Sequence, residues 1–177
     1  MKLNREYDEI TQSILYNDKF VILKNDNHHG TNKYDHSKRV SYLSFLIAKM
    51  FRANSKEAAK AGLLHDFFYG ERTEKEENSY LNHPITSANN AKKYFCITEN
   101  EEKIIKSHMY HHAICKKLTP FLTEKDKDYL KKYKPNSKES IIVCISDLLV
   151  SIFEVGTFKI RYSTSLYIIF LINIFRY

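Results

Sequence analysis

Two acidic residues lie in strongly apolar parts of this chain, and they constrain its fold more than any other feature. Asp66 follows the helical run Ala58–Leu64 and precedes an aromatic turn, Phe67–Gly70. Asp147 lies inside the apolar segment Ile141–Val150. A buried carboxylate is rare and costly unless a partner compensates its charge. The fold must therefore bring compensating groups to both acids, and a metal ion held with histidines would do this.

Histidines along the chain could help to compensate the charges of these two buried acids. His65 is the neighbour of Asp66, and others stand at His36, His83 and His108. Imidazole nitrogens and carboxylate oxygens bind Mn, Fe, Zn or Ni without the thiolates of structural zinc sites. Each histidine alone has an ordinary alternative, because His36 could be a satisfied core residue and His83 an exposed helix cap. The histidines and acids taken together are stronger evidence for a metal site than any one of them alone.

His111 and His112 leave two interpretations open. Each lies about one turn from His108, so either could bind an ion together with it. They are also expected at a fraying helix end, in solvent.

Hydrophobic spacing and capping signals predict an all-α bundle of about six helices. With only 4 Gly and 3 Pro, the chain has few breakers, which suits helices better than a fold with many turns. No strand is expected with confidence. The predicted helices cover residues 4–23, 35–52, 55–66, 83–95 and 138–155, and another begins at the capping box Thr98–Glu101 and carries His108. Charged loops are expected at 70–82 and 116–137, the second with a short helix at 124–133.

The predicted helices direct the candidate ligands inward. His36 falls on the apolar stripe of its helix, and His83, followed by Pro84, falls at a helix start. Neighbours on a helix point about 100° apart, so His65 and Asp66 both reach one ion only if it lies between helices. The predicted set is His36, His65, Asp66, His83, His108 and Asp147.

Length and composition indicate a single domain, residues 1–177, in the cytoplasm. Cys96, Cys115 and Cys144 lack the paired spacing of disulfide frameworks or zinc ribbons, and the N-terminus lacks the apolar core of a signal peptide. The net charge of +7 is mostly lysine and is attributed to compositional bias, so nucleic acid is not the expected partner. The apolar stretch 166–175 is too short to span a membrane. The tail 156–177 is an atypical end, which could seal the core or mediate homodimerisation.

The order and context of these residues resemble the HD-domain superfamily of metal-dependent phosphohydrolases. The likeness covers roughly residues 28–155 and looks closest to small single-domain bacterial members that carry a His-His-Gly-Thr turn, here at 28–31. The matching segments are Tyr34–Val40, Ala61–Asp66, His83-Pro84, Ile104–His108 and Ile145–Asp147.

The resemblance implies one or two divalent ions per chain. His36, His65, Asp66 and Asp147 would hold the first, and His83 and His108 the second, with Asp66 bridging. Mn or Fe is favoured, with Zn, Ni, Co and Mg as alternatives.

The chain departs from the pattern of many relatives at two positions. Met109 stands where a second adjacent histidine often follows the position of His108. Tyr69 stands where many relatives have a lysine that assists the phosphate chemistry. Either the Tyr69 hydroxyl takes over that role, or a cation does so, and the candidates are Arg39, Lys38 and Lys106.

The sequence therefore predicts hydrolysis of a phosphoester on a small nucleotide-like substrate, with Asp66 and His65 as the catalytic residues. The main alternative is a catalytically weak or inactive module that binds metal and nucleotide for signalling. An enzyme acting on nucleic acid and a membrane role through the tail are the lesser alternatives.

Overall fold

The computed structural model describes residues 2–28, 31–70, 79–117 and 122–174, and the side chains of these residues between 4 and 156 except Asn27 and His28. The described residues are almost entirely helical, so the all-α prediction is confirmed. A short antiparallel pair joins β1 (Asn27–His28) to β2 (Thr31–Asn32). The helices are α1 (Lys2–Leu15), α2 (Asp18–Val21), a 3₁₀ turn (Ile22–Asn25), α3 (Lys33–Met50), α4 (Ser55–Leu64), α5 (His83–Tyr94), α6 (Glu99–Ser107), α7 (Tyr110–Lys117), α8 (Glu124–Lys132) and α9 (Lys138–Ile174).

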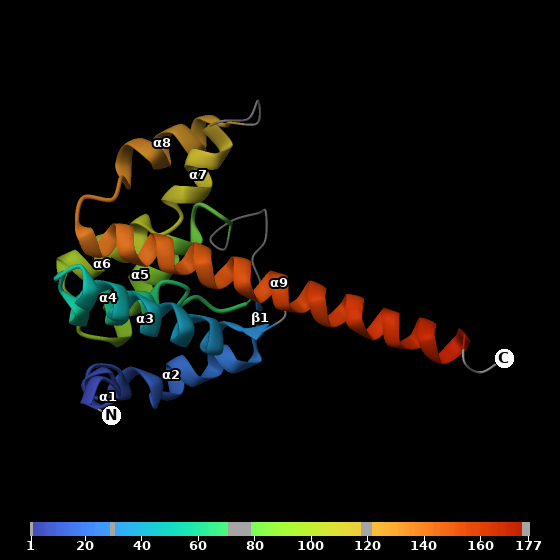
Figure 1. Ribbon diagram of the computed structural model, residues 1–177. Coiled ribbons are helices and arrows are strands. Elements are labelled where there is room, and N and C mark those ends of the chain that lie inside the picture. Colours follow the sequence, from blue (N-terminus) through green and yellow to red (C-terminus); the bar gives the residue numbers. More distant parts are fainter. Residues whose placement is uncertain (1, 29–30, 71–78, 118–121, 175–177) are drawn as a thin grey trace.

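Helix α3 is the centre of the arrangement. It packs against α4 and α9, while α6 packs against α4, α5 and α9. Helices α7 and α8 pack on each other at one end of the molecule, and α1 and α2 lie at the opposite end (Figure 1). The second half of α9 extends beyond the rest of the chain (Figure 1). Among the described residues, no helix combines the length and hydropathy needed to cross a membrane.

One large apolar cluster joins nearly all of these elements. Burial of this apolar surface is the main favourable term in folding, and it fixes the helices relative to one another. Its fully buried members include Phe20, Leu23, Leu63, Leu64, Phe67, Ile104 and Val143.

The helix starts follow from local capping. The Asn32 side chain accepts a hydrogen bond from the Asp35 amide at 2.8 Å, and that of Asn54 accepts from the Glu57 amide at 3.2 Å. The capping box of Thr98 and Glu101 is present. Each cap satisfies amides that the first helical turn leaves unpaired, so the starts of α3, α4 and α6 are encoded locally.

Gly62 sets the spacing between α3 and α4. A Cβ atom at this position would lie 3.0 Å from Ser41 Cα and 3.2 Å from Ser44 Oγ. The Ser41 hydroxyl donates to Ala59 O at 2.7 Å and accepts from the Tyr7 hydroxyl at 3.0 Å, which ties α1, α3 and α4 together. This close approach brings the end of α4, and hence the His65-Asp66 pair, toward α3.

Three expected helix boundaries are wrong. The helix expected at 4–23 breaks, because the Asn17 side chain accepts from the Lys19 amide at 2.9 Å and starts α2. The helix expected to carry His108 ends at Ser107, and a new helix starts at Tyr110. The helix expected at 138–155 continues to residue 174, since Gly156 alone does not stop it.

The short β1–β2 pair was not expected either, and the labelled helices exceed the six predicted ones. Parts of several predictions lie outside the described residues. These parts are residues 29–30 of the His-His-Gly-Thr turn, 71–78 and 118–121 of the charged loops, and the side chains of the tail from residue 157.

We predict that Gly62→Ala lowers the free energy of unfolding by about 1–3 kcal/mol, because the added methyl group would push α3 and α4 apart. The matched control is Gly156→Ala. No atom lies within 4 Å of a Cβ built there, so alanine should leave stability unchanged or raise it by up to about 1 kcal/mol. Urea unfolding of both variants checks this, and equal effects would contradict the proposed contact.

Candidate metal centre

The structure brings all six predicted ligand residues together. His36 lies in the first turn of α3 and Asp147 in α9, while His65 and Asp66 directly follow α4. His83 is the first residue of α5, and His108 is the C-cap of α6. Five of these side chains have no solvent exposure and Asp147 is 4% exposed. Residues from five separate segments therefore converge in the interior of the protein.

One half of the cluster joins α3, α4 and α9. His36 Nε2 lies 3.1 Å from Asp147 Oδ1, and His65 Nε2 lies 3.6 Å from the same oxygen. One ligand atom from each of His36, His65 and Asp147 lies within 4.8 Å of the others. This spacing suits three ligands around one ion.

The other half joins α4, α5 and α6. His65, Asp66 and His108 again offer ligand atoms within 4.8 Å of one another. Asp66 Oδ1 lies 3.2 Å from His83 Nε2 and 3.6 Å from His108 Nε2, while Asp66 Oδ2 lies 3.7 Å from His65 Nε2. The two oxygens of Asp66 thus face different histidines, and His65 belongs to both halves.

Backbone carbonyls determine the tautomer and the ring orientation of three of the histidines. Nδ1 of His65 lies 2.8 Å from Gly62 O, Nδ1 of His83 lies 3.1 Å from Ser79 O, and Nδ1 of His108 lies 2.8 Å from Ile105 O. A carbonyl oxygen only accepts, so each Nδ1 carries the proton and donates it. In the neutral rings, Nε2 therefore carries a lone pair, which points into the cluster.

The lone pairs are close enough to repel one another. His83 Nε2 and His108 Nε2 are only 3.0 Å apart. Within the part of the chain that the structure describes, the buried His65 Nε2 has no hydrogen-bond partner. Inward lone pairs on imidazoles and carboxylates, with donors turned outward, form the arrangement that holds a metal ion. The residues present therefore fit a divalent cation.

The electrostatics of His108 and Asp147 favour the same protonation states. Burial lowers the pKa of His108 well below its usual value, and the neighbouring His65 and His83 lower it further. Burial alone would raise the pKa of Asp147, but the hydrogen bond with His36 and the proximity of His65 hold it well below its usual value. His108 is thus a neutral donor and Asp147 a charged one, which is what metal binding requires.

His36 differs from the other three histidines because carboxylates face both of its nitrogens. Its Nδ1 lies 2.8 Å from Glu154 Oε2, a residue that sequence reasoning did not select. Burial would lower the pKa of His36, but hydrogen bonds to Asp147 and Glu154 outweigh it and raise the pKa to about 9. The spacing of Glu154 from Asp147, two helical turns along one face, was the signal that could have identified it.

A second residue missed by sequence reasoning, Lys33, holds the loop that follows Asp66. Its buried ammonium lies 3.0 Å from Phe68 O and 3.2 Å from Asp26 Oδ2, and it also donates to Gly70 O. A buried ammonium with several acceptors is a strong local constraint. Lys33 therefore fixes the backbone directly after the metal-ligand candidates.

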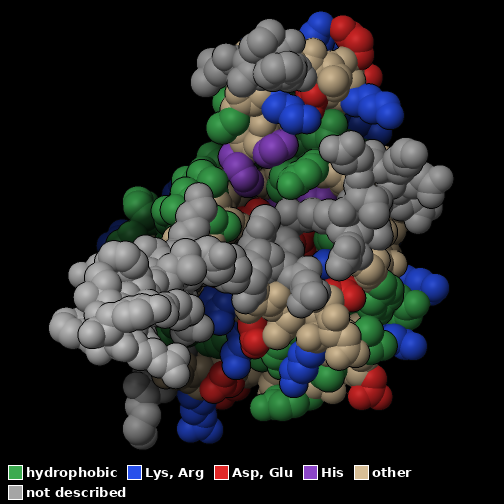
Figure 2. All heavy atoms as spheres, turned by 90° about the vertical axis from the view of Figure 1, so that its right-hand side faces the viewer, with side chains coloured by type: hydrophobic (Ala, Val, Ile, Leu, Met, Phe, Trp, Pro, Cys, Tyr) green, Lys and Arg blue, Asp and Glu red, His purple; other side chains and the backbone are tan. Residues whose placement is uncertain are grey.

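His111 and His112 are not in solvent at a frayed end, as one interpretation expected. Both are half-buried on α7. His111 Nδ1 lies 3.4 Å from Cys144 Sγ, and the His112 ring stacks on Tyr80 at 4.9 Å. On the face shown in Figure 2, histidine side chains reach the surface in the upper part of the molecule. His111 also contacts the ligand candidate His108, because its Nδ1 lies 3.0 Å from His108 O.

The four predicted substrate-binding residues are more scattered. The Tyr69 hydroxyl donates to Lys19 O at 3.2 Å, and Lys106 Nζ is 2.6 Å from Glu102 Oε1. These contacts direct Tyr69 toward α2 and Lys106 along the outer side of α6. The structure does not bring either group to the six-residue cluster.

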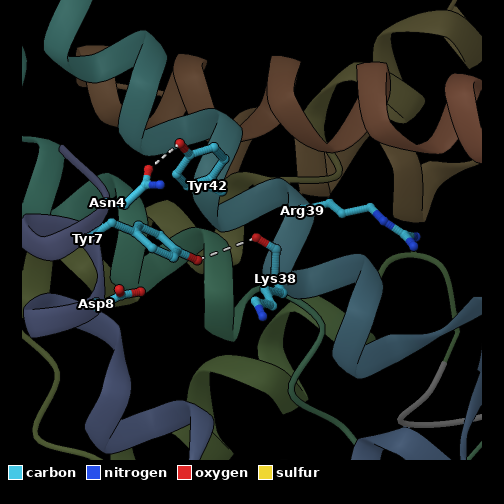
Figure 3. Close-up of a pocket in the computed structure, with 6 residues that line it drawn as sticks. All are labelled: Asn4, Tyr7, Asp8, Lys38, Arg39 and Tyr42. Carbon is cyan, nitrogen blue, oxygen red and sulfur yellow. Dashed lines mark hydrogen bonds between the residues drawn. The ribbon is translucent and has the colours of Figure 1, made fainter. Parts of the chain in front are cut away.

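Lys38 and Arg39 line a surface cavity of about 450 Å³ between α1 and α3 (Figure 3). Asn4, Tyr7, Asp8 and Tyr42 complete its walls. Arg39 points away from the two tyrosines (Figure 3), and its guanidinium lies 2.6 Å from Glu154 Oε1. Arg39 is therefore connected to the cluster through Glu154, whereas Lys38 remains exposed at the cavity.

Comparison with protein families shows to which family the chain belongs. The sequence profile of the HD domain matches residues 34–151, which include all six residues of the cluster. The chain belongs to the HD-domain superfamily. Members of this superfamily bind divalent metals and are generally hydrolases. Comparisons with curated proteins and with solved structures find no significant match.

The shared position of Asp66 in this HD domain leads to a prediction about metal content. Asp66→Ala should lose both ions, because its two oxygens face the histidines of both halves. His36→Ala, His65→Ala and His83→Ala should each lose at most one, since each imidazole offers a single Nε2 lone pair. Elemental analysis of protein loaded with Mn²⁺ and then desalted measures the stoichiometry. His112→Ala, outside the cluster, is the control and should retain the wild-type content; full retention in Asp66→Ala would contradict the assignment.

Proposed function

We propose that the protein is a metal-dependent phosphohydrolase that cleaves a phosphomonoester or phosphodiester of a small, nucleotide-like substrate. The observation that carries this proposal is the set of lone pairs converging in a buried cluster. A protein gains nothing in stability from repelling acceptors, so the cluster is best explained by an ion that it holds for chemistry. Membership of the HD-domain superfamily supports the same conclusion.

The roles of the ligands follow from the two halves of the cluster. His36, His65 and Asp147 would hold one ion, His83 and His108 would hold a second, and Asp66 would contribute an oxygen to each. The donors are nitrogen and oxygen, which favours Mn or Fe and leaves Zn, Ni, Co and Mg as alternatives. Burial raises the pKa of the Cys144 thiol to about 11, so it stays protonated and is not a candidate ligand.

When bound, such ions lower the pKa of water toward neutrality and neutralise phosphoryl oxygens. The chain's own residues supply orientation and proton transfer. Asp66 faces both halves with separate oxygens, so it is placed to orient an attacking water and accept its proton. His65 donates its Nδ1 proton to Gly62 O, which keeps its Nε2 directed into the cluster.

Cations near the cluster would bind the phosphate of the substrate. Arg39 is half exposed and already tethered by Glu154, and the neighbouring Lys38 is exposed at the cavity between α1 and α3. The free cysteines fit a reducing compartment such as the cytoplasm.

The alternative is a module that binds metal and nucleotide but turns over slowly or not at all. One observation favours it, because Tyr69 and Lys106 form contacts away from the cluster. No group at the position of the usual lysine is then directed toward the phosphate.

We predict that Asp66→Ala reduces Mn²⁺-dependent hydrolysis of p-nitrophenyl phosphate and of nucleoside phosphates by more than about 100-fold, since it removes several kcal/mol of electrostatic stabilisation. Asp128→Ala, an exposed acid on α8, is the control and should leave turnover unchanged. Wild-type turnover in Asp66→Ala would rule the site out.

The two functions are distinguished by one further measurement. A panel of nucleoside mono-, di- and triphosphates and cyclic nucleotides is tested for binding by calorimetry and for turnover by phosphate release, with Mn²⁺ present. The hydrolase predicts release of phosphate or nucleotide product from at least one class. Tight binding with no turnover across the panel would favour the signalling module.

A further inference from the structure

A buried acid on α9 links the cluster to the surface of α3. Glu154 is only 6% exposed, although a carboxylate is among the groups least suited to burial. It lies two helical turns beyond Asp147, so both carboxylates project from one face of α9 toward α3. A charged side chain in this position requires specific partners.

Both oxygens of Glu154 have such partners. Oε2 lies 2.8 Å from His36 Nδ1, and Oε1 lies 2.6 Å from an Arg39 guanidinium nitrogen. The other nitrogen of His36, Nε2, lies 3.1 Å from Asp147 Oδ1. A continuous chain of charge-assisted contacts thus runs from Arg39 through Glu154 and His36 to the cluster.

This contact distinguishes His36 from the other ligand candidates. The Nδ1 atoms of His65, His83 and His108 all face neutral backbone carbonyls, at 2.8, 3.1 and 2.8 Å. Only His36, among these four, donates its Nδ1 proton to a carboxylate. A carboxylate acceptor fixes the ring orientation and increases the basicity of the opposite nitrogen more than a carbonyl does.

We propose that Glu154 is a positioning residue that makes His36 the strongest imidazole donor of the cluster. As a result, the ion held by His36, His65 and Asp147 is bound more tightly than the ion in the other half. Arg39 compensates the charge of Glu154 in the interior and holds its carboxylate in place. This inference rests on the proposed metal centre, and it adds an order of binding between the two ions.

The test is a titration of metal-free protein with Zn²⁺ and Mn²⁺ in competition with a chelator of known affinity. Wild-type protein should show a tighter and a weaker binding event. Glu154→Gln keeps the shape and an acceptor oxygen but removes the charge. It should weaken the tighter event by about 10–100-fold and leave the weaker one unchanged.

The matched control is Glu102→Gln, which removes a carboxylate on α6 that is paired with Lys92 and Lys106 and is not part of the cluster. Its two binding events should match those of wild type. Urea unfolding of the metal-free variants checks folding. If Glu154→Gln does not fold, Glu154→Asp takes its place, and it should weaken the same single event because the shorter side chain retains the charge but lengthens the contact.

The outcomes separate the inference from the proposed function. Two binding events that are unchanged in Glu154→Gln would overturn the role of Glu154 and leave the metal centre intact. Equal weakening of both events would also overturn it, because a purely structural effect has no preference for one half. Wild-type protein that binds neither ion would overturn both claims.

Discussion

Buried lone pairs that face one another are the constraint on which this structure depends. In the metal-binding tautomers, imidazole Nε2 atoms and carboxylate oxygens converge in the buried interior. Such groups repel unless a cation or protons lie between them, and the repulsion is strong where the dielectric constant is low. The outward contacts of Nδ1 with backbone carbonyls set the tautomers, so the need for a cation is built into the helix ends themselves.

The fold can be understood as the scaffold that holds these groups in place. The close approach at Gly62 brings the end of α4 to α3, and α9 carries its acids across the same space. Lys33 fixes the loop after Asp66 from the first turn of α3. Residues at helix ends and on packed helix faces have little freedom, so the ligand atoms keep their separations without the ion. Ligand atoms that are held in position before the ion binds favour both metal binding and catalysis.

Much of this arrangement could be predicted from sequence because its determinants are local. Asn54 and the Thr98 capping box define helix starts within a few residues, and acids in apolar runs identify buried positions such as Asp147. The missed features depend on distant partners. His36 and Glu154 are separated by 118 positions, and the one local signal for Glu154 is its spacing from Asp147 on the same helix face. The break at Asn17 and the end of α6 before His108 depend on side-chain contacts that compete with the helix, which periodicity does not reveal.

The most direct test of the account is anomalous diffraction from crystals of the protein as purified, recorded at the absorption edges of manganese, iron and zinc. The account predicts one or two anomalous peaks inside the cluster, within about 2.0–2.3 Å of His65 Nε2 and of an oxygen of Asp66 or Asp147. A cluster with no peak, in which the six side chains are hydrogen-bonded to one another through protons, would contradict it.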